Sequence, residues 1–67
     1  MITETYGGHT IRGFAKPLVD GSFESSGAVE KDGQVLENSD PLGYYPTFDR
    51  ALAEGLAWAR EWVDVHI

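Results

Sequence analysis

Residue types that carry out catalysis are few in this chain of 67 residues, and they are scattered along it. The two histidines, His9 and His66, lie near opposite ends, and general base catalysis requires such a side chain to be held in a pocket. The serines stand in no sequence context typical of a nucleophile elbow or a catalytic triad: Ser22, Ser25, Ser26 and Ser39. We therefore expect a protein that is not an enzyme.

Metal and cofactor chemistry is equally poorly supported by the spacing of residues. The chain has no cysteine, and its carboxylates do not follow the spacing of a zinc or calcium site. The glycines Gly7, Gly8 and Gly13 lack the GxGxxG spacing of a phosphate-binding loop and precede no helical pattern. We expect no metal and no cofactor. Residues 1–8 are interpreted as a flexible N-terminal arm, followed by a single domain at 9–67.

The charge of the chain disfavours nucleic acid as a partner. Eleven acidic and five basic residues give a net charge of −6, whereas nucleic-acid binding depends on Lys and Arg placed against phosphates. The basic residues available on the expected strands are Arg12, Lys16 and Lys31, and they are the contacts that an alternative, sheet-mediated nucleic-acid-binding function would use. The acidic composition fits solubility or a basic partner.

The remaining composition indicates a small cytoplasmic protein. The absence of cysteine excludes disulfides, the chain opens without a basic and apolar signal, and no stretch reaches the roughly 18 apolar residues of a membrane span. A chain of this length buries only a small core. Contacts with a second copy could supply further stability, so we consider self-association.

Two Asp-Gly pairs predict hairpins, because Asp-Gly suits the positive φ angles of a type I′ turn. Around Asp20-Gly21 and Asp32-Gly33 we expect strands at about 9–18, 22–31 and 34–38, forming an antiparallel meander. Two-residue turns would place Lys31 opposite Gln34, Glu30 opposite Val35, Val29 opposite Leu36 and Phe14 opposite Gly27. One face then carries the core residues Phe14, Leu18, Phe23, Val29 and Leu36, and the other carries Ile11, Ala15, Val19, Ala28 and Val35.

The last third of the chain predicts a helix after a loop at 39–46, which contains two prolines. Asp49 is the expected N-cap, with Thr47 as the alternative. An apolar stripe recurs at helical spacing: Leu52, Leu56, Ala59 and Val63. On one side of the stripe Trp62 is expected in the core and Trp58 partly exposed. Gly55 inside a helix costs about 1 kcal/mol relative to Ala, so we expect it to serve a close approach.

These patterns predict an α+β domain, with a three-stranded meander and one C-terminal helix packed on one face. Its expected function is non-catalytic binding, to another protein or to a second copy of itself. The candidate interaction surface combines aromatic and apolar side chains that the pattern leaves near the helix margin or on the second sheet face: Trp58, Tyr44, Tyr45, Ile11 and Val35.

The β-β-β-α outline and the helix start FDRALA (48–53) resemble the AP2-type DNA-binding domain and the double-stranded-RNA-binding domain, which implies sheet-mediated nucleic-acid binding. The stretches DGSFESSGAVEKDG and YYPTFDRALAEGLAWA resemble the N-terminal domain of HicB-type antitoxins, which implies a regulatory role against a basic toxin. The chain is also similar over residues 11–64 to small uncharacterised bacterial proteins, through RGFAKP, F-x-S-S-G, F-D-x-A-x-A-x-G and a terminal WVD. That similarity implies the same fold and no assigned activity.

Overall fold

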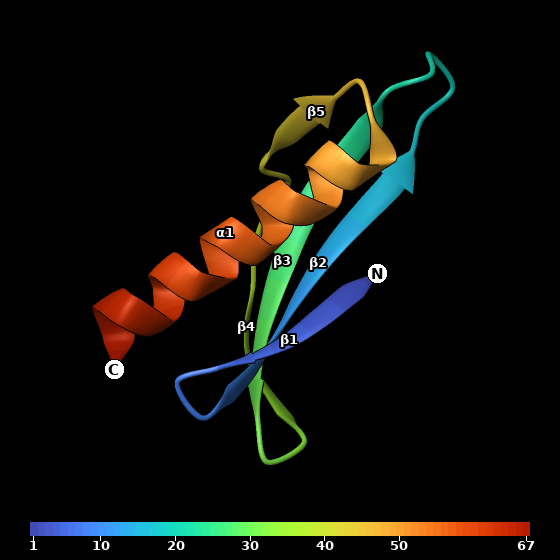
Figure 1. Ribbon diagram of the computed structural model, residues 1–67. Helices are drawn as coiled ribbons and strands as arrows, with labels where there is room; N and C mark the ends of the chain where they lie inside the picture. Colours follow the sequence, from blue (N-terminus) through green and yellow to red (C-terminus); the bar gives the residue numbers. More distant parts are fainter.

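A computed structural model describes all 67 residues as one antiparallel sheet and one long helix. The helix runs diagonally across one face of the sheet and leaves the other face open (Figure 1). The elements follow in the order β1 (Ile2–Tyr6), β2 (His9–Pro17), β3 (Phe23–Lys31), β4 (Gln34–Asn38), β5 (Gly43–Tyr45) and α1 (Phe48–His66). The expected α+β class and the C-terminal helix are confirmed.

The sheet has five strands where the sequence predicted three. Its spatial order is β1-β2-β3-β4, and the short β5 also pairs with β3. Strand β1 occupies the segment that was expected as a flexible arm, and it joins β2 through Gly7 and Gly8, whose φ angles are 56° and 79°. Two consecutive positive φ angles are those of a type I′ hairpin turn, so this Gly-Gly pair was a third hairpin signal.

The predicted register of the β2–β3 hairpin is wrong by one residue. Gly13, not Phe14, lies opposite Gly27, and the last pair is Pro17 with Phe23, so the connection spans 18–22. Asp20 stabilises this longer loop by accepting hydrogen bonds from the backbone N–H and the hydroxyl of Ser22 (2.9 and 2.6 Å).

A slip of one residue reverses the face of every side chain on a strand. Ile11 is therefore fully buried under the helix, although the sequence pattern placed it on the second face. Phe14, expected in the core, lies instead opposite Ser26 on the face that the helix does not cover. In the observed register, the buried glycines Gly13 and Gly27 lie opposite each other and face the helix.

The second hairpin follows the prediction near its turn and departs from it further on. Asp32 and Gly33 have φ angles of 52° and 80°, and the pairs Lys31–Gln34 and Glu30–Val35 are as expected. A bulge then shifts the register, so that Val29 lies opposite Glu37 and not opposite Leu36. Leu36 is consequently 43% exposed and not a core residue.

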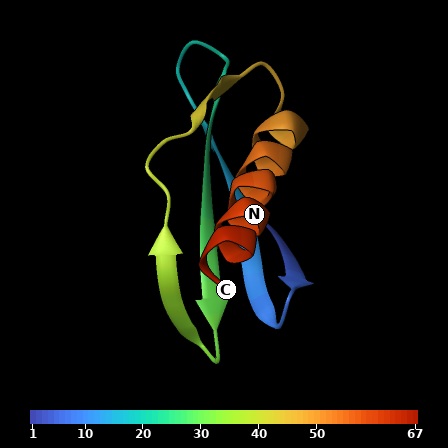
Figure 2. The ribbon, with the colours of Figure 1, turned by 90° about the vertical axis from the view of Figure 1, so that its left-hand side faces the viewer.

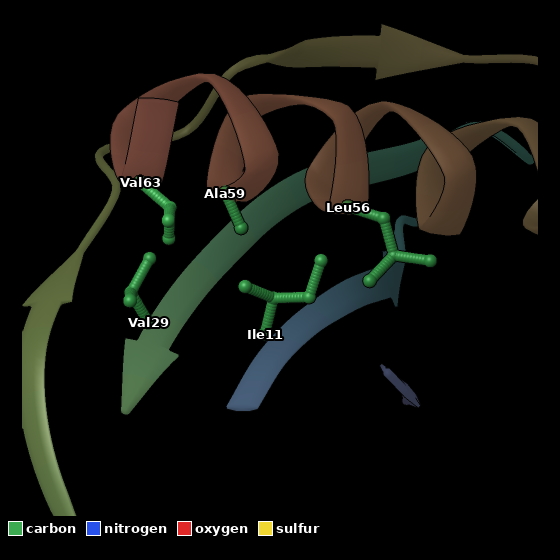
Figure 3. Packing of buried hydrophobic residues seen from close by; sticks show 5 residues of the cluster. All are labelled: Ile11, Val29, Leu56, Ala59 and Val63. Carbon is green, nitrogen blue, oxygen red and sulfur yellow. The ribbon is translucent and has the colours of Figure 1, made fainter. Parts of the chain in front are cut away.

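Helix α1 buries the predicted stripe. The side chains of Leu56, Ala59 and Val63 point from the helix toward Ile11 of β2 and Val29 of β3, and these five residues form the main core cluster (Figure 3). The N-cap is Thr47, the alternative, and not Asp49: its hydroxyl accepts the backbone N–H of Arg50 at 3.1 Å.

Three glycines let the helix lie directly on the backbone of the sheet. A Cβ atom on Gly55 would overlap the carbonyl oxygen of Ser26, and one on Gly13 would overlap that of Leu52. On Gly27 a Cβ would lie 2.5 Å from the carbonyl oxygen of Gly55. We call Gly13, Gly27 and Gly55 the glycine seat. The predicted close approach at Gly55 is thus observed, and its partners are two strand glycines.

Candidate functional site

The edge of β3 that faces away from β2 is shared by two strands with a loop between them. β4 pairs with the C-terminal part of β3, and β5 pairs with Phe23–Ser25 at its start. The intervening loop is fixed to the sheet at both ends. The backbone N–H of Ser39 donates to the carbonyl of Gly27 (2.8 Å) and its hydroxyl accepts the Gly27 N–H (2.8 Å), while the N–H of Leu42 donates to the carbonyl of Ser25 (2.8 Å).

Two tryptophans, one helical turn apart, line the side of α1 that faces this loop. Trp58 lies over Gly27, where its Cε3 atom would be 2.8 Å from a Cβ. Trp62 stacks on His66, with ring centroids 4.1 Å apart and planes at 12°. Both indoles are partly buried against the core cluster. The partial exposure predicted for Trp58 is observed, but Trp62 shares it and is not a core residue.

A pocket of ≈ 410 Å³ opens between the tryptophans and the loop, lined by residues 37–42, Trp58 and Trp62. In Figure 2 the helix covers β3 and β2, and β4 lies on the other side of β3. No Cα atom of β4 lies within 8 Å of a Cα atom of α1. We call this pocket the tryptophan groove.

The charges lining the tryptophan groove are exclusively negative. Glu37 and Asp40 contribute carboxylates, and neither forms an ion pair. No basic side chain lines the groove. Three of the five basic residues are held elsewhere by carboxylates of the chain itself, in the pairs Arg12–Glu30, Arg50–Glu54 and Arg60–Glu4.

The residues predicted as an interaction surface do not come together. Ile11 is in the core, with none of its surface exposed. Val35 and Tyr44 are 54% and 63% exposed, but they pair with Glu30 and Glu24, whose side chains lie on the face away from the helix. Tyr45 lies beneath the Arg50 guanidinium, 5.4 Å from ring centre to Cζ. Of the five, Trp58 alone lines the groove.

The predicted nucleic-acid contacts are also dispersed. Arg12 bonds to Glu30 and to the Thr3 hydroxyl, and the hydrogen bond to Glu30 raises the pKa of its guanidinium. Lys16 lies opposite Glu24. Lys31 has the strand parity of Val29 and thus belongs to the other face of the sheet. The three cations therefore do not form a continuous basic patch.

Both histidines and Ser25 lie within hydrogen-bonding distance of backbone carbonyl groups. His9 is buried, with its Nδ1 2.9 Å from the carbonyl oxygen of Gly7, and His66 is exposed near the C-terminus. Ser25, fully buried, donates its hydroxyl to the carbonyl of Ala51 at 2.6 Å. No group of three or more His, Cys, Asp or Glu has a metal-binding arrangement.

The groove residues that were not predicted from the sequence are Trp62 and residues 37–42, which form the end of β4 and the loop after it. In comparisons with protein-family models, with curated proteins and with solved structures, nothing matches this chain. No family match therefore supports the resemblances to AP2-type, double-stranded-RNA-binding and antitoxin domains or to small bacterial proteins, and the sheet has five strands in place of the expected three. The one helix lacks the run of apolar residues that crossing a bilayer requires.

Proposed function

We propose that this protein is a small cytoplasmic, non-catalytic binding module, and that it binds another protein through the tryptophan groove. The observation that carries the proposal is the pair of partly buried indoles, Trp58 and Trp62, on the wall of a formed pocket. Tryptophan is enriched among the residues that dominate the binding energy of protein interfaces.

Both walls of the groove are held in place before any partner arrives. The glycine seat fixes the helix wall against the sheet, and the hydrogen bonds from Ser39 and Leu42 to β3 fix the loop wall. Binding to a preformed site avoids the entropic cost of ordering flexible segments. The open sheet face offers no comparable concavity, because the tryptophan groove is the single pocket of the molecule.

The acidic lining favours a protein partner over nucleic acid, whose phosphates the carboxylates of Glu37 and Asp40 would repel. Sheet-mediated nucleic-acid binding and an antitoxin-like role remain the alternatives that the fold outline suggests. For the former, the dispersal of Arg12, Lys16 and Lys31 is unfavourable.

Site-specific photocrosslinking in the host cell tests this proposal. A photoreactive p-benzoylphenylalanine at Pro41, which lines the groove and is exposed, is compared with one at Lys16, exposed on the open face. We expect a protein adduct from position 41 that survives nuclease, is absent from position 16, and is lost when Trp58 is changed to Ala. Adducts from position 16 alone, or only to nucleic acid, would refute the proposal. An adduct to a second copy of the chain would identify the partner as the protein itself.

A further inference from the structure

Building on the proposed function, we infer that the tryptophan groove binds an arginine side chain from a basic segment of the partner protein. The guanidinium would lie against the indole of Trp58 or Trp62, within reach of the carboxylates of Glu37 and Asp40. The inference combines three independent features: the aromatic wall, the unpaired negative charge, and an arrangement of the same kind already filled elsewhere in the chain.

The aromatic wall is suited to a planar cation. The face of an indole attracts cations more strongly than any other aromatic side chain, and arginine, being planar and weakly hydrated, stacks on it readily. His66 already covers one face of Trp62. Trp62 can therefore offer at most one face to an incoming guanidinium, and the exposed part of the partly buried Trp58 ring is the alternative contact.

The carboxylates of the groove lack a cationic partner within the chain. Glu37 accepts only the backbone N–H of its neighbour Asn38, at 3.2 Å, and no hydrogen bond of Asp40 occurs within the protein. Two acidic side chains at the rim of a concave site concentrate a negative potential there. A guanidinium can satisfy such carboxylates with several charge-assisted hydrogen bonds.

The other end of the helix shows the same chemistry with its cation in place. The Arg50 guanidinium lies 5.4 Å from the centre of the Tyr45 ring and bonds to the carboxylate of Glu54 at 3.4 Å. Aromatic ring, carboxylate and guanidinium thus occur together on the surface of α1. The tryptophan groove has the aromatic rings and the carboxylates but lacks the guanidinium, which the partner would supply.

The two indole N–H signals in a ¹H–¹⁵N spectrum report directly on the groove. The probe is the peptide acetyl-Gly-Arg-Gly-amide, and its matched control carries citrulline, which keeps the shape of arginine without the charge. We expect the arginine peptide to shift the Trp58 and Trp62 indole signals and to bind about tenfold more tightly than the citrulline peptide. Its affinity should fall between about 20 and 150 mM salt.

Two charge variants locate the effect. The double substitution Glu37→Gln/Asp40→Asn should weaken binding of the arginine peptide several-fold, whereas Glu24→Gln/Asp32→Asn, which removes the same charge away from the groove, should leave it nearly unchanged. Equal binding of arginine and citrulline peptides, equal effects of the two double variants, or no shift of either indole would each overturn the arginine inference. The photocrosslink from position 41 tests the groove itself and would survive those outcomes if the partner binds there by other chemistry.

Discussion

The two long flanks of α1 are joined to the rest of the molecule in different ways. On the β1 flank, the Tyr6 hydroxyl donates to Asp64 at 2.8 Å, and Arg60 donates to Glu4 at 3.0 Å. On the opposite flank the helix faces residues 37–42, the end of β4 and the loop after it, and no hydrogen bond or ion pair connects them to the helix. One flank has its polar partners within the chain, and the other presents indoles and carboxylates without them.

This contrast separates the part of the molecule that holds the fold together from the part for which we propose binding. The helix position is determined by the glycine seat and the core cluster, which lie between the flanks. Exposed ion pairs such as Glu4–Arg60 contribute little stability on their own. The polar contacts of the β1 flank thus join the helix to the sheet but contribute little to the free energy of unfolding. The groove flank has no such contacts, and the glycine seat holds the helix in place without them.

The largest expected loss of stability comes from substituting a residue of the glycine seat, because a displaced helix would disturb both flanks. Changing Gly55 to Ala places a methyl group against the Ser26 carbonyl, and overpacking of this kind costs about 1–3 kcal/mol. Helix propensity alone predicts the reverse, a gain of about 1 kcal/mol. Chemical denaturation measures the free energy of unfolding. The exposed Ala57→Gly is the control and should lose about 1 kcal/mol; a gain in stability for Gly55→Ala would contradict the seat.

A smaller effect is expected from removing an indole on the groove flank. Changing Trp58 to Ala should retain the fold and cost about 1 kcal/mol of unfolding free energy, because the side chain is only partly buried and full burial of a large apolar side chain contributes about 1.5–3 kcal/mol. The same variant should lose the photocrosslinked partner. A fall in stability larger than that of Gly55→Ala would place Trp58 in the core and not at its margin.

On the β1 flank, a double-mutant cycle over Glu4→Gln and Arg60→Gln isolates the ion pair. We expect a coupling of about 0.2–1 kcal/mol at low salt, which shrinks as added salt screens the two exposed charges. Thermal unfolding of the four proteins at two salt concentrations gives the coupling. A coupling energy well above this range would mean that the β1 flank contributes part of the stability that we assign to the glycine seat.

The smallest effect is expected for the Tyr6–Asp64 hydrogen bond, and it depends on pH. The bond donated to Asp64 raises the pKa of the Tyr6 hydroxyl above its ordinary value of 10.0. Its contribution is therefore complete below the unfolded-state pKa and is lost as the pH rises through the higher folded-state pKa. The wild type should be slightly more stable than Tyr6→Phe at neutral pH, and the difference should vanish in strongly alkaline solution. A difference independent of pH would rule out this hydrogen bond as its cause.

Local signals in the sequence predicted the helix and the turns better than they predicted the register between the strands. The Asp32-Gly33 turn, the apolar stripe of α1 and the close approach at Gly55 follow from neighbouring residues alone. The β2–β3 register does not, because Asp20-Gly21 suggests a two-residue turn, whereas the strands separate after Pro17–Phe23 and Asp20 hydrogen-bonds to Ser22 within a longer loop. That single slip exchanged the predicted faces of β2 and misplaced Ile11.

The candidate site was predictable only in part. The helical position of Trp58 identified one wall of the groove, at the margin of the apolar stripe. The other wall depends on contacts between residues distant in sequence: Ser39 with Gly27, and Leu42 with Ser25. The bulge that shifts the register between β3 and β4 is likewise a property of strand pairing. Periodicity within one segment contains no information about such contacts.

The division of the β3 edge between β4 and β5 also bears on aggregation. A long unpaired strand edge can template the addition of another chain, because its backbone N–H and C=O groups are free. Here that side of the sheet ends in strands of five and three residues. Between them lies a loop with Pro41, which has no N–H to donate. The edge beside the groove therefore presents few consecutive free N–H and C=O groups with which the strand of another chain could pair.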